Sequence, residues 1–251
     1  MIIEYDGTGY HGFQVQNGVR TIQGDIEQAL FLVTGERIRI TGAGRTDAGV
    51  HAKKQVVSLS TASRMAPETL GRALNFYLGR EIAVKSVRVA QPDFNARRDA
   101  ISREYSYRIL NSPVRSPLLQ NHAHHLALTL DAGLMNEACK DLEGVHDFAS
   151  FTGPTEKRTV RNVHKAMVSR EGDLVTFTIA ANSFLPRQVR NTMGSLIKVG
   201  TGRMAVNDFA ELLEAKAPGL AGPAVPAQGL YLVNVKYPDN KLDKGRVDEN
   251  V

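Results

Sequence analysis

This 251-residue chain has almost no cysteine, and it also lacks long apolar runs and a recognisable targeting segment. Cys139 is the single cysteine, so an intramolecular disulfide is impossible, and a reducing compartment such as the cytoplasm fits the composition. It lies in a helical pattern, where a cysteine is most often a small core residue. No apolar run approaches the roughly 20 residues of a membrane-spanning helix, and no secretory or transit segment is recognisable at the start. We therefore expect a cytoplasmic protein without a membrane segment.

The motifs that hold nucleotides in many metabolic enzymes are also missing. A phosphate-cradling loop requires Gly-Lys-Ser or Gly-Lys-Thr, and neither tripeptide occurs in the sequence. A dinucleotide fingerprint that began at Gly42-Ala43-Gly44 would need its third glycine at the position of Asp47. These two absences argue against a nucleotide- or phosphate-binding metabolic enzyme.

What is present is the composition of an ordinary globular protein with an excess of positive charge. Hydrophobic residues make up 42% of the chain and charged residues 23%, which excludes wholesale disorder. Lysine and arginine total 31 against 26 acidic residues, giving a net charge of +5. This sign is expected of a protein that binds a polyanion such as nucleic acid. Charge alone does not establish that function, because many basic proteins are simply soluble enzymes.

Hydrophobic periodicity predicts helices and strands that alternate without a strict strand-helix-strand rhythm. Apolar residues recur at helical spacing from Ile22 to Val33, with Thr21 as the cap and Gly35 as the stop. Further helices are predicted from Pro67 and over residues 130–142, 187–199 and 207–215, and strands over residues 37–41, 55–59, 82–87, 105–110, 163–169, 174–180 and 230–236. This pattern predicts an α+β protein.

The order of these elements predicts two α+β halves followed by a tail. The first half covers residues 1–98 and the second covers residues 99–238, a length that can bury a sizeable core. Residues 239–251 are charged and lack apolar periodicity, so we expect this tail to be frayed. Neither composition nor linker chemistry marks the boundary between the halves sharply.

The most informative segment is the octapeptide Gly44-Arg45-Thr46-Asp47-Ala48-Gly49-Val50-His51, which follows the predicted strand 37–41. Glycines let the backbone turn tightly and let a ligand approach closely. An arginine near an aspartate favours the ionised carboxylate and so lowers its pKa. A carboxylate of this kind is poised as a nucleophile or base, whereas an isolated glycine-flanked aspartate more often only caps a turn.

The octapeptide resembles the active-site signature of the tRNA pseudouridine synthase A family, in which the aspartate is catalytic. Other segments resemble the family in order along the chain, so that the resemblance extends from about Ile2 to Pro238. They are residues 3–14, 93–97, 103–107, 184–196 and 229–232. Carried over position by position, the resemblance implies that Asp47 is catalytic and that Arg45, Tyr105 and Arg190 bind the substrate.

The resemblance also implies a fold and a function. The fold would be two mixed halves with largely antiparallel sheets that meet around a central active-site cleft. The function would be isomerisation of uridine to pseudouridine at positions 38 to 40 in the anticodon stem-loop of tRNA, by a homodimer. The reaction exchanges a bond at uracil N1 for one at C5, so we expect neither a redox cofactor nor a metal.

Tyr105 and Arg190 have ordinary structural interpretations as well. Tyr105 and Tyr107 are two residues apart on a predicted strand, where both would face the same side of a sheet. An aromatic ring that stacks on a base gains about 1–3 kcal/mol, and we favour that role for Tyr105. Arg190 adjoins apolar helix positions, from which an arginine usually extends to solvent, whereas the resemblance implies that it pairs with Asp47.

Weaker signals concern RNA and metal binding. Arg97 and Arg103 are candidates for phosphate contacts, and His51 is a candidate for contact with RNA. The alternative is that these residues belong to solvated faces, as most charged residues do. The histidines within 122–125 invite a metal site, but no cysteine or acidic residue completes a ligand set nearby, so no metal is expected.

Two functions therefore remain. The first is a tRNA-modifying isomerase, and the second is a non-catalytic module of the same fold that binds tRNA or another RNA. The joint presence of Asp47, Arg45, Tyr105 and Arg190 favours the enzyme, because binding alone has no need of that set.

Overall fold

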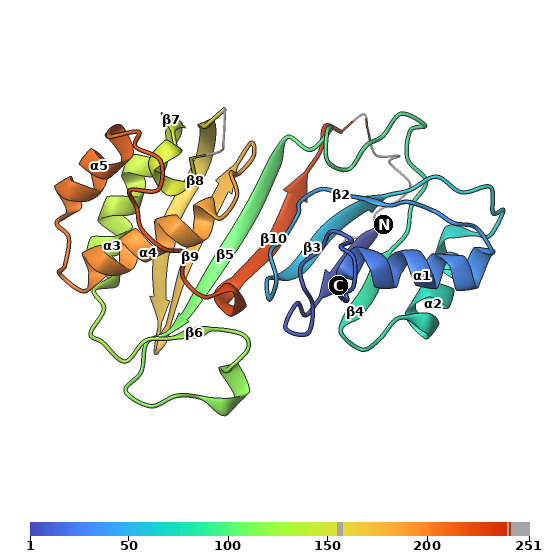
Figure 1. The fold of residues 1–251 in the computed structure, drawn as a ribbon, viewed down its shortest axis with the longest axis horizontal. Coiled ribbons are helices and arrows are strands. Elements are labelled where there is room, and N and C mark those ends of the chain that lie inside the picture. Colours follow the sequence, from blue (N-terminus) through green and yellow to red (C-terminus); the bar gives the residue numbers. More distant parts are fainter. Residues whose placement is uncertain (155–157, 240, 242–251) are drawn as a thin grey trace. The chain divides into compact units, whose positions relative to one another are not determined.

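The computed structural model describes residues 1–154, 158–239 and 241, which form an α+β protein as the sequence predicts (Figure 1). The chain divides into two compact units. Unit 1 comprises Met1–Ile101 together with the chain from Asn234 onward, and unit 2 comprises Ser102–Val233. The predicted boundary at residue 98 stays a prediction, and the predicted frayed tail lies outside the described residues apart from Asp239 and Lys241.

Unit 1 is a sheet of antiparallel strands with two helices. The strands follow the order β4-β1-β3, and the short β2 pairs with β3. The helices α1 and α2 pack against each other, and α2 packs on β4. The bounds are β1 (Ile2–Tyr5), α1 (Ile22–Thr34), β2 (Thr41–Gly42), β3 (His51–Ser58), α2 (Pro67–Tyr77) and β4 (Ile82–Ser86).

Helix α1 shows how local sequence sets an element. The Thr21 side chain accepts a hydrogen bond from the Gly24 N–H at 3.2 Å, which satisfies one of the donors that a helix start leaves open. At the other end Gly35 adopts a φ of 74°, and its N–H donates to the Phe31 carbonyl. Ile26 and Leu30 are fully buried on the inner face. The predicted cap and stop are both confirmed.

Unit 2 is a larger sheet covered by a layer of helices (Figure 1). Its strands follow the order β5-β9-β8-β7 in antiparallel pairs, and the short β6 pairs with β5 in parallel. Helix α3 packs on β8 and on both α4 and α5. The bounds are β5 (Ser102–Leu110), β6 (His124–His125), α3 (Ala132–Cys139), β7 (Gly144–Asp147), β8 (Val160–Glu171), β9 (Leu174–Ala181), α4 (Gln188–Gly200) and α5 (Val206–Glu214).

Strand β9 illustrates the pattern that holds this sheet to its helices. Val175, Phe177 and Ile179 are fully buried, and they alternate with half-buried positions. Alternation with a period of two places all of these apolar side chains on one face. Strand β10 (Leu230–Lys236) begins in unit 2 and ends in unit 1. Within the described part of the chain, no helix has the length and apolar character needed to span a membrane.

The strand predicted over residues 37–41 is wrong except at its last residue, because only Thr41–Gly42 forms β2. Side chains from α1 satisfy the backbone before it. The Ile40 N–H donates to Glu27 Oε1 at 3.1 Å, and the Ile40 carbonyl accepts from Gln23 Nε2 at 3.3 Å. Backbone groups that are already bonded to side chains do not need a strand partner.

The thiol of Cys139 should be unreactive in the folded protein. The residue is fully buried in the last turn of α3, and burial raises the pKa of its thiol to about 11. Because the thiolate is the reactive form, we expect a disulfide reagent at pH 8 to label the native protein only as fast as it unfolds. Complete labelling in guanidinium chloride is the control, and rapid labelling without denaturant would contradict this burial.

Candidate functional site

The octapeptide forms the connection between β2 and β3 in unit 1. The ladder between these strands continues for one residue past β2, since the Ala43 N–H donates to the Val56 carbonyl at 2.8 Å. The chain then turns through Asp47, whose carbonyl accepts from the Val50 N–H at 3.2 Å. Gly49 lies in this turn with a φ of 78°, a conformation that favours glycine. Asp47 therefore lies at the corner of a tight turn between two paired strands.

A second glycine-rich loop, residues 6–13, packs its backbone directly against the octapeptide. The Phe13 N–H donates to the Thr46 carbonyl at 3.0 Å, and the Gly49 N–H donates to the Tyr10 carbonyl at 3.3 Å. A Cβ on Gly12 would lie 2.8 Å from Thr46 O, and one on Gly7 would collide with the Val50 carbonyl. The glycines of residues 6–13 thus allow a close approach between two protein backbones.

Helix α1 anchors the outer side of the glycine-rich loop. The Tyr10 hydroxyl donates to Asp25 Oδ2 at 2.9 Å, and Arg20 Nε donates to the same oxygen at 2.9 Å. The Arg20 guanidinium also lies over the Tyr10 ring, 4.5 Å from its centroid. Burial and the bond to Asp25 raise the pKa of Tyr10 well above its ordinary value, so its hydroxyl remains a donor. Further along the loop, the Gly12 carbonyl accepts from the Ile22 N–H at 3.2 Å.

Two buried side chains, those of Tyr5 and Gln55, hold the inner side of the octapeptide, and the sequence analysis did not assign them this role. The Tyr5 hydroxyl and Thr46 Oγ1 are 2.8 Å apart. Gln55 Oε1 accepts from the Gly44 N–H at 3.1 Å, while Gln55 Nε2 donates to the Gly44 carbonyl at 2.9 Å. The available signal was Gln55 itself, a polar residue within the apolar run of a predicted strand.

His51 ends the octapeptide and lies in the protein interior, with an exposed fraction of 2%. The Gly7 N–H donates to its Nδ1 at 3.1 Å, and Asp6 Oδ1 is 3.1 Å from the same nitrogen. The ring therefore links the two loops. The observed contacts of the His51 ring are with the glycine-rich loop, and its predicted contact with RNA stays a prediction.

The two predicted arginines of unit 1 lie at the surface. Arg45 is exposed within the octapeptide, two residues before the half-buried Asp47. Arg97 is exposed in a turn whose backbone is held by Asn95, because the Arg97 N–H donates to Asn95 Oδ1 at 3.0 Å. The fold therefore directs both cationic side chains outward from the same unit.

Unit 2 distinguishes the two tyrosines of β5. Tyr107 is fully buried, its hydroxyl donates to the Pro226 carbonyl at 2.8 Å, and burial raises its pKa. Tyr105 is half-buried, and its ring meets Phe184 edge to face at a centroid distance of 5.1 Å. Tyr107 is thus a core residue, whereas Tyr105 remains partly accessible.

The predicted arginines of unit 2 are both bonded to backbone carbonyls. Arg190 lies in the first turn of α4, and its Nε donates to the Val225 carbonyl at 2.7 Å. Arg103 lies in β5, and one of its terminal nitrogens donates to the Asn182 carbonyl at 2.8 Å. These bonds orient the guanidinium groups. The predicted pairing of Arg190 with Asp47 stays a prediction.

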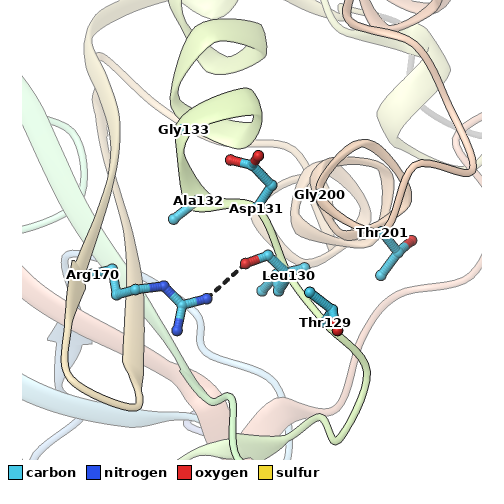
Figure 2. A pocket seen from close by; sticks show the side chains of 8 residues that line it. All are labelled: Thr129, Leu130, Asp131, Ala132, Gly133, Arg170, Gly200 and Thr201. Atoms are coloured by element: carbon cyan, nitrogen blue, oxygen red, sulfur yellow. Dashed lines mark hydrogen bonds between the residues drawn. The ribbon is translucent and has the colours of Figure 1, made fainter.

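A hollow on unit 2 lies where α3 begins and α4 ends, as Figure 2 shows. Asp131 caps α3 by accepting from the Leu134 N–H at 3.0 Å, and Arg170 donates to the Leu130 carbonyl at 2.7 Å. Both polar groups are engaged in hydrogen bonds that stabilise the backbone. None of the predicted site residues lines the hollow. Its lining comprises Thr129, Leu130, Asp131, Ala132, Gly133, Arg170, Gly200 and Thr201.

Comparisons with known proteins give consistent matches. A family model described as tRNA pseudouridine synthase matches residues 1–97 and 138–238. The tRNA pseudouridine synthase A of Chloroflexus aurantiacus is 44% identical over 244 residues, covering 95% of this chain and 88% of that protein. The enzyme of that name from Methylacidiphilum infernorum is 39% identical over 244 residues, with coverages of 96% and 96%. The one from Neisseria meningitidis serogroup C is 41% identical over 240 residues, with coverages of 94% and 91%.

Replacing Gly12 by alanine tests the packing of the two loops. The matched control is Gly18→Ala, because Gly18 also has a positive φ, 77° against 91°, but has open space where the Cβ would stand. Positive φ costs about 1–2 kcal/mol for either alanine. Gly12→Ala additionally drives a Cβ onto Thr46 O, so we expect its free energy of unfolding to fall by about 1–3 kcal/mol more. Equal losses in chemical denaturation would contradict the close approach.

Proposed function

Since this chain belongs to the tRNA pseudouridine synthase family and is an isomerase that forms pseudouridine in tRNA, we propose that Asp47 is its catalytic residue and uridines 38 to 40 of the anticodon stem-loop are its targets. The observation that carries the role of Asp47 is the geometry of the octapeptide, whereas the target positions follow from the family resemblance. Asp47 lies on a turn whose backbone is held by the glycine-rich loop and by buried side chains of two strands. A catalytic carboxylate needs such support, because small misplacements slow a reaction strongly.

The reaction itself sets the demands on the residues. The bond between ribose C1′ and uracil N1 breaks, the base turns, and C1′ bonds to C5. The proton on C5 is lost and N1 gains one, so there is no net oxidation or reduction. A carboxylate must attack or deprotonate the sugar-base unit, and we assign this step to Asp47. The reaction as written requires no cofactor.

The base must leave its stack before it reacts, which costs a few kcal/mol. We assign the support of the flipped base to Tyr105, whose ring is half-buried and steadied by Phe184. Stacking of a base on an aromatic ring returns about 1–3 kcal/mol. Tyr107 does not suit this role, because its ring is fully buried.

The arginines supply positive charge to the proposed site and to the RNA. Arg45, exposed beside Asp47, contacts the substrate, and Arg190 also binds the substrate, as the family resemblance implies. Arg97 and Arg103 neutralise phosphates of the tRNA. These roles follow from the family resemblance and from the positive charge of the chain.

We further propose that the protein acts as a homodimer, as the resemblance implies, and that it is located in the cytoplasm, as its cysteine content suggests. The free, buried thiol of Cys139 is compatible with a reducing compartment.

Asp47→Asn should abolish turnover while tRNA affinity stays within a few-fold of wild type. Asparagine keeps the size and turn-forming capacity of the residue but cannot act as nucleophile or base. The measurement is tritium release from tRNA labelled at uracil C5, in the presence of a chelator, together with filter binding. The control is Asp141→Asn, an exposed carboxylate after α3.

Retained turnover in Asp47→Asn would remove Asp47 from the catalytic role. If wild type bound tRNA but released no tritium from any labelled substrate, the RNA-binding module would replace the enzyme as the function.

Tyr105→Ala should reduce the single-turnover rate by about 5- to 150-fold, which corresponds to the stacking energy of one base. Tyr105→Phe keeps the ring and should retain most of the rate. Tyr107→Phe is the control, since it removes only the hydroxyl bond to Pro226 and should lower stability without changing the rate. A normal rate in Tyr105→Ala would assign Tyr105 to packing alone.

A further inference from the structure

Gln55 is a polar side chain at a position where the fold would ordinarily place an apolar one. It lies in the middle of β3, on the same inward-facing set of positions as Val57, and both residues are fully buried. A buried amide is unfavourable unless its donor and acceptor are both bonded. An apolar residue at this position would need no hydrogen bonds. The hydrogen bonds of Gln55 therefore indicate the role of its amide.

Both polar ends of the Gln55 amide bond to a single residue, Gly44. Oε1 accepts from the Gly44 N–H at 3.1 Å, and Nε2 donates to the Gly44 carbonyl at 2.9 Å. The backbone ladder runs out at the preceding residue, where the Ala43 N–H donates to Val56. The Gln55 side chain therefore replaces the strand partner for one residue, and the backbone leaves the sheet at a defined point.

Tyr5 holds the side chain of Thr46, two residues after Gly44. Its hydroxyl is 2.8 Å from Thr46 Oγ1, and Gln55 Nε2 lies 3.5 Å from the same hydroxyl. Tyr5 is 2% exposed and lies in β1, which pairs with β3. The carbonyl of Thr46 is held from the opposite side by the Phe13 N–H. Two rigid strands thus fix the residues on either side of Arg45, directly before Asp47.

We propose that Gln55 is a positioning residue for the isomerisation, acting with Tyr5 to hold Gly44 and Thr46 so that Arg45 and Asp47 keep their reactive orientation. The inference rests on the proposed function of Asp47. Neither side chain is exposed to RNA, because both are buried. Loss of the network should therefore slow the chemical step and leave tRNA binding nearly unchanged, since a displacement of about 1 Å can reduce a rate about 100-fold.

The test is Gln55→Met, which keeps the length of the side chain and removes the amide. We expect the single-turnover rate of tritium release at saturating tRNA to fall about 10- to 100-fold, with the dissociation constant for tRNA within a few-fold of wild type. Tyr5→Phe removes one hydroxyl, is the milder variant if Gln55→Met does not fold, and should shift the rate in the same direction. Because both act through one network, the double variant should be less slow than the product of the single effects predicts.

A stability control separates positioning from packing. Leu74→Ala opens a cavity at a fully buried position of α2, in the same unit and outside the octapeptide. It should lower stability but keep the rate at a temperature where every variant is folded. A wild-type rate in both Gln55→Met and Tyr5→Phe would overturn the inference, as would weaker tRNA binding at an unchanged rate. Asp47→Asn in the same assay distinguishes the two ideas, because activity in that variant would defeat the proposed function instead.

Discussion

The close packing of two backbones is the constraint on which the rest of unit 1 depends. Gly12 lies so near the Thr46 carbonyl that no side chain fits between them, and the Phe13 N–H bonds to that carbonyl. Elements around the two loops hold this arrangement from both sides. Asp25 of helix α1 accepts a hydrogen bond from Tyr10 of the glycine-rich loop. Buried polar side chains of β1 and β3 form hydrogen bonds with the octapeptide. The turn that carries Asp47 is therefore supported by regular structure, although it is itself a loop.

In unit 2, two tyrosines on one strand differ in burial and in the partners of their rings. Tyr105 and Tyr107 are neighbours on the same face of β5, yet only Tyr107 is enclosed completely. Its hydroxyl finds a carbonyl partner at Pro226, as a buried hydroxyl requires. The ring of Tyr105 meets Phe184 edge to face, which orients its plane, and the residue stays partly accessible. A fixed and accessible ring is suited to hold a planar base.

Elements that depend on local chemistry were predictable, and those that depend on distant partners were less so. The start and end of α1 follow from Thr21 and Gly35, because caps act within one turn. The strand expected over residues 37–41 shrinks to Thr41–Gly42, because Glu27 and Gln23 of α1 bond to the backbone of Ile40. Periodicity contains no information on such bonds. Strand β3 begins at His51, four residues before the predicted strand over residues 55–59. The prediction missed these first residues because the apolar run that marks a strand begins only after Gln55.

The sequence by itself determined the α+β class, the family and the identity of the octapeptide, because these reside in composition, periodicity and contiguous residues. Tertiary structure alone decided what supports Asp47. Tyr5 and Thr46 are separated by 41 positions in the chain, and the Gly7–His51 bond joins residues 44 positions apart. These groups meet only because β1 pairs antiparallel with β3, and strand pairing brings together residues whose spacing in the sequence carries no signal. The amide of Gln55 reaches Gly44 because a second pairing, that of β2 with β3, brings Gly44 opposite Gln55.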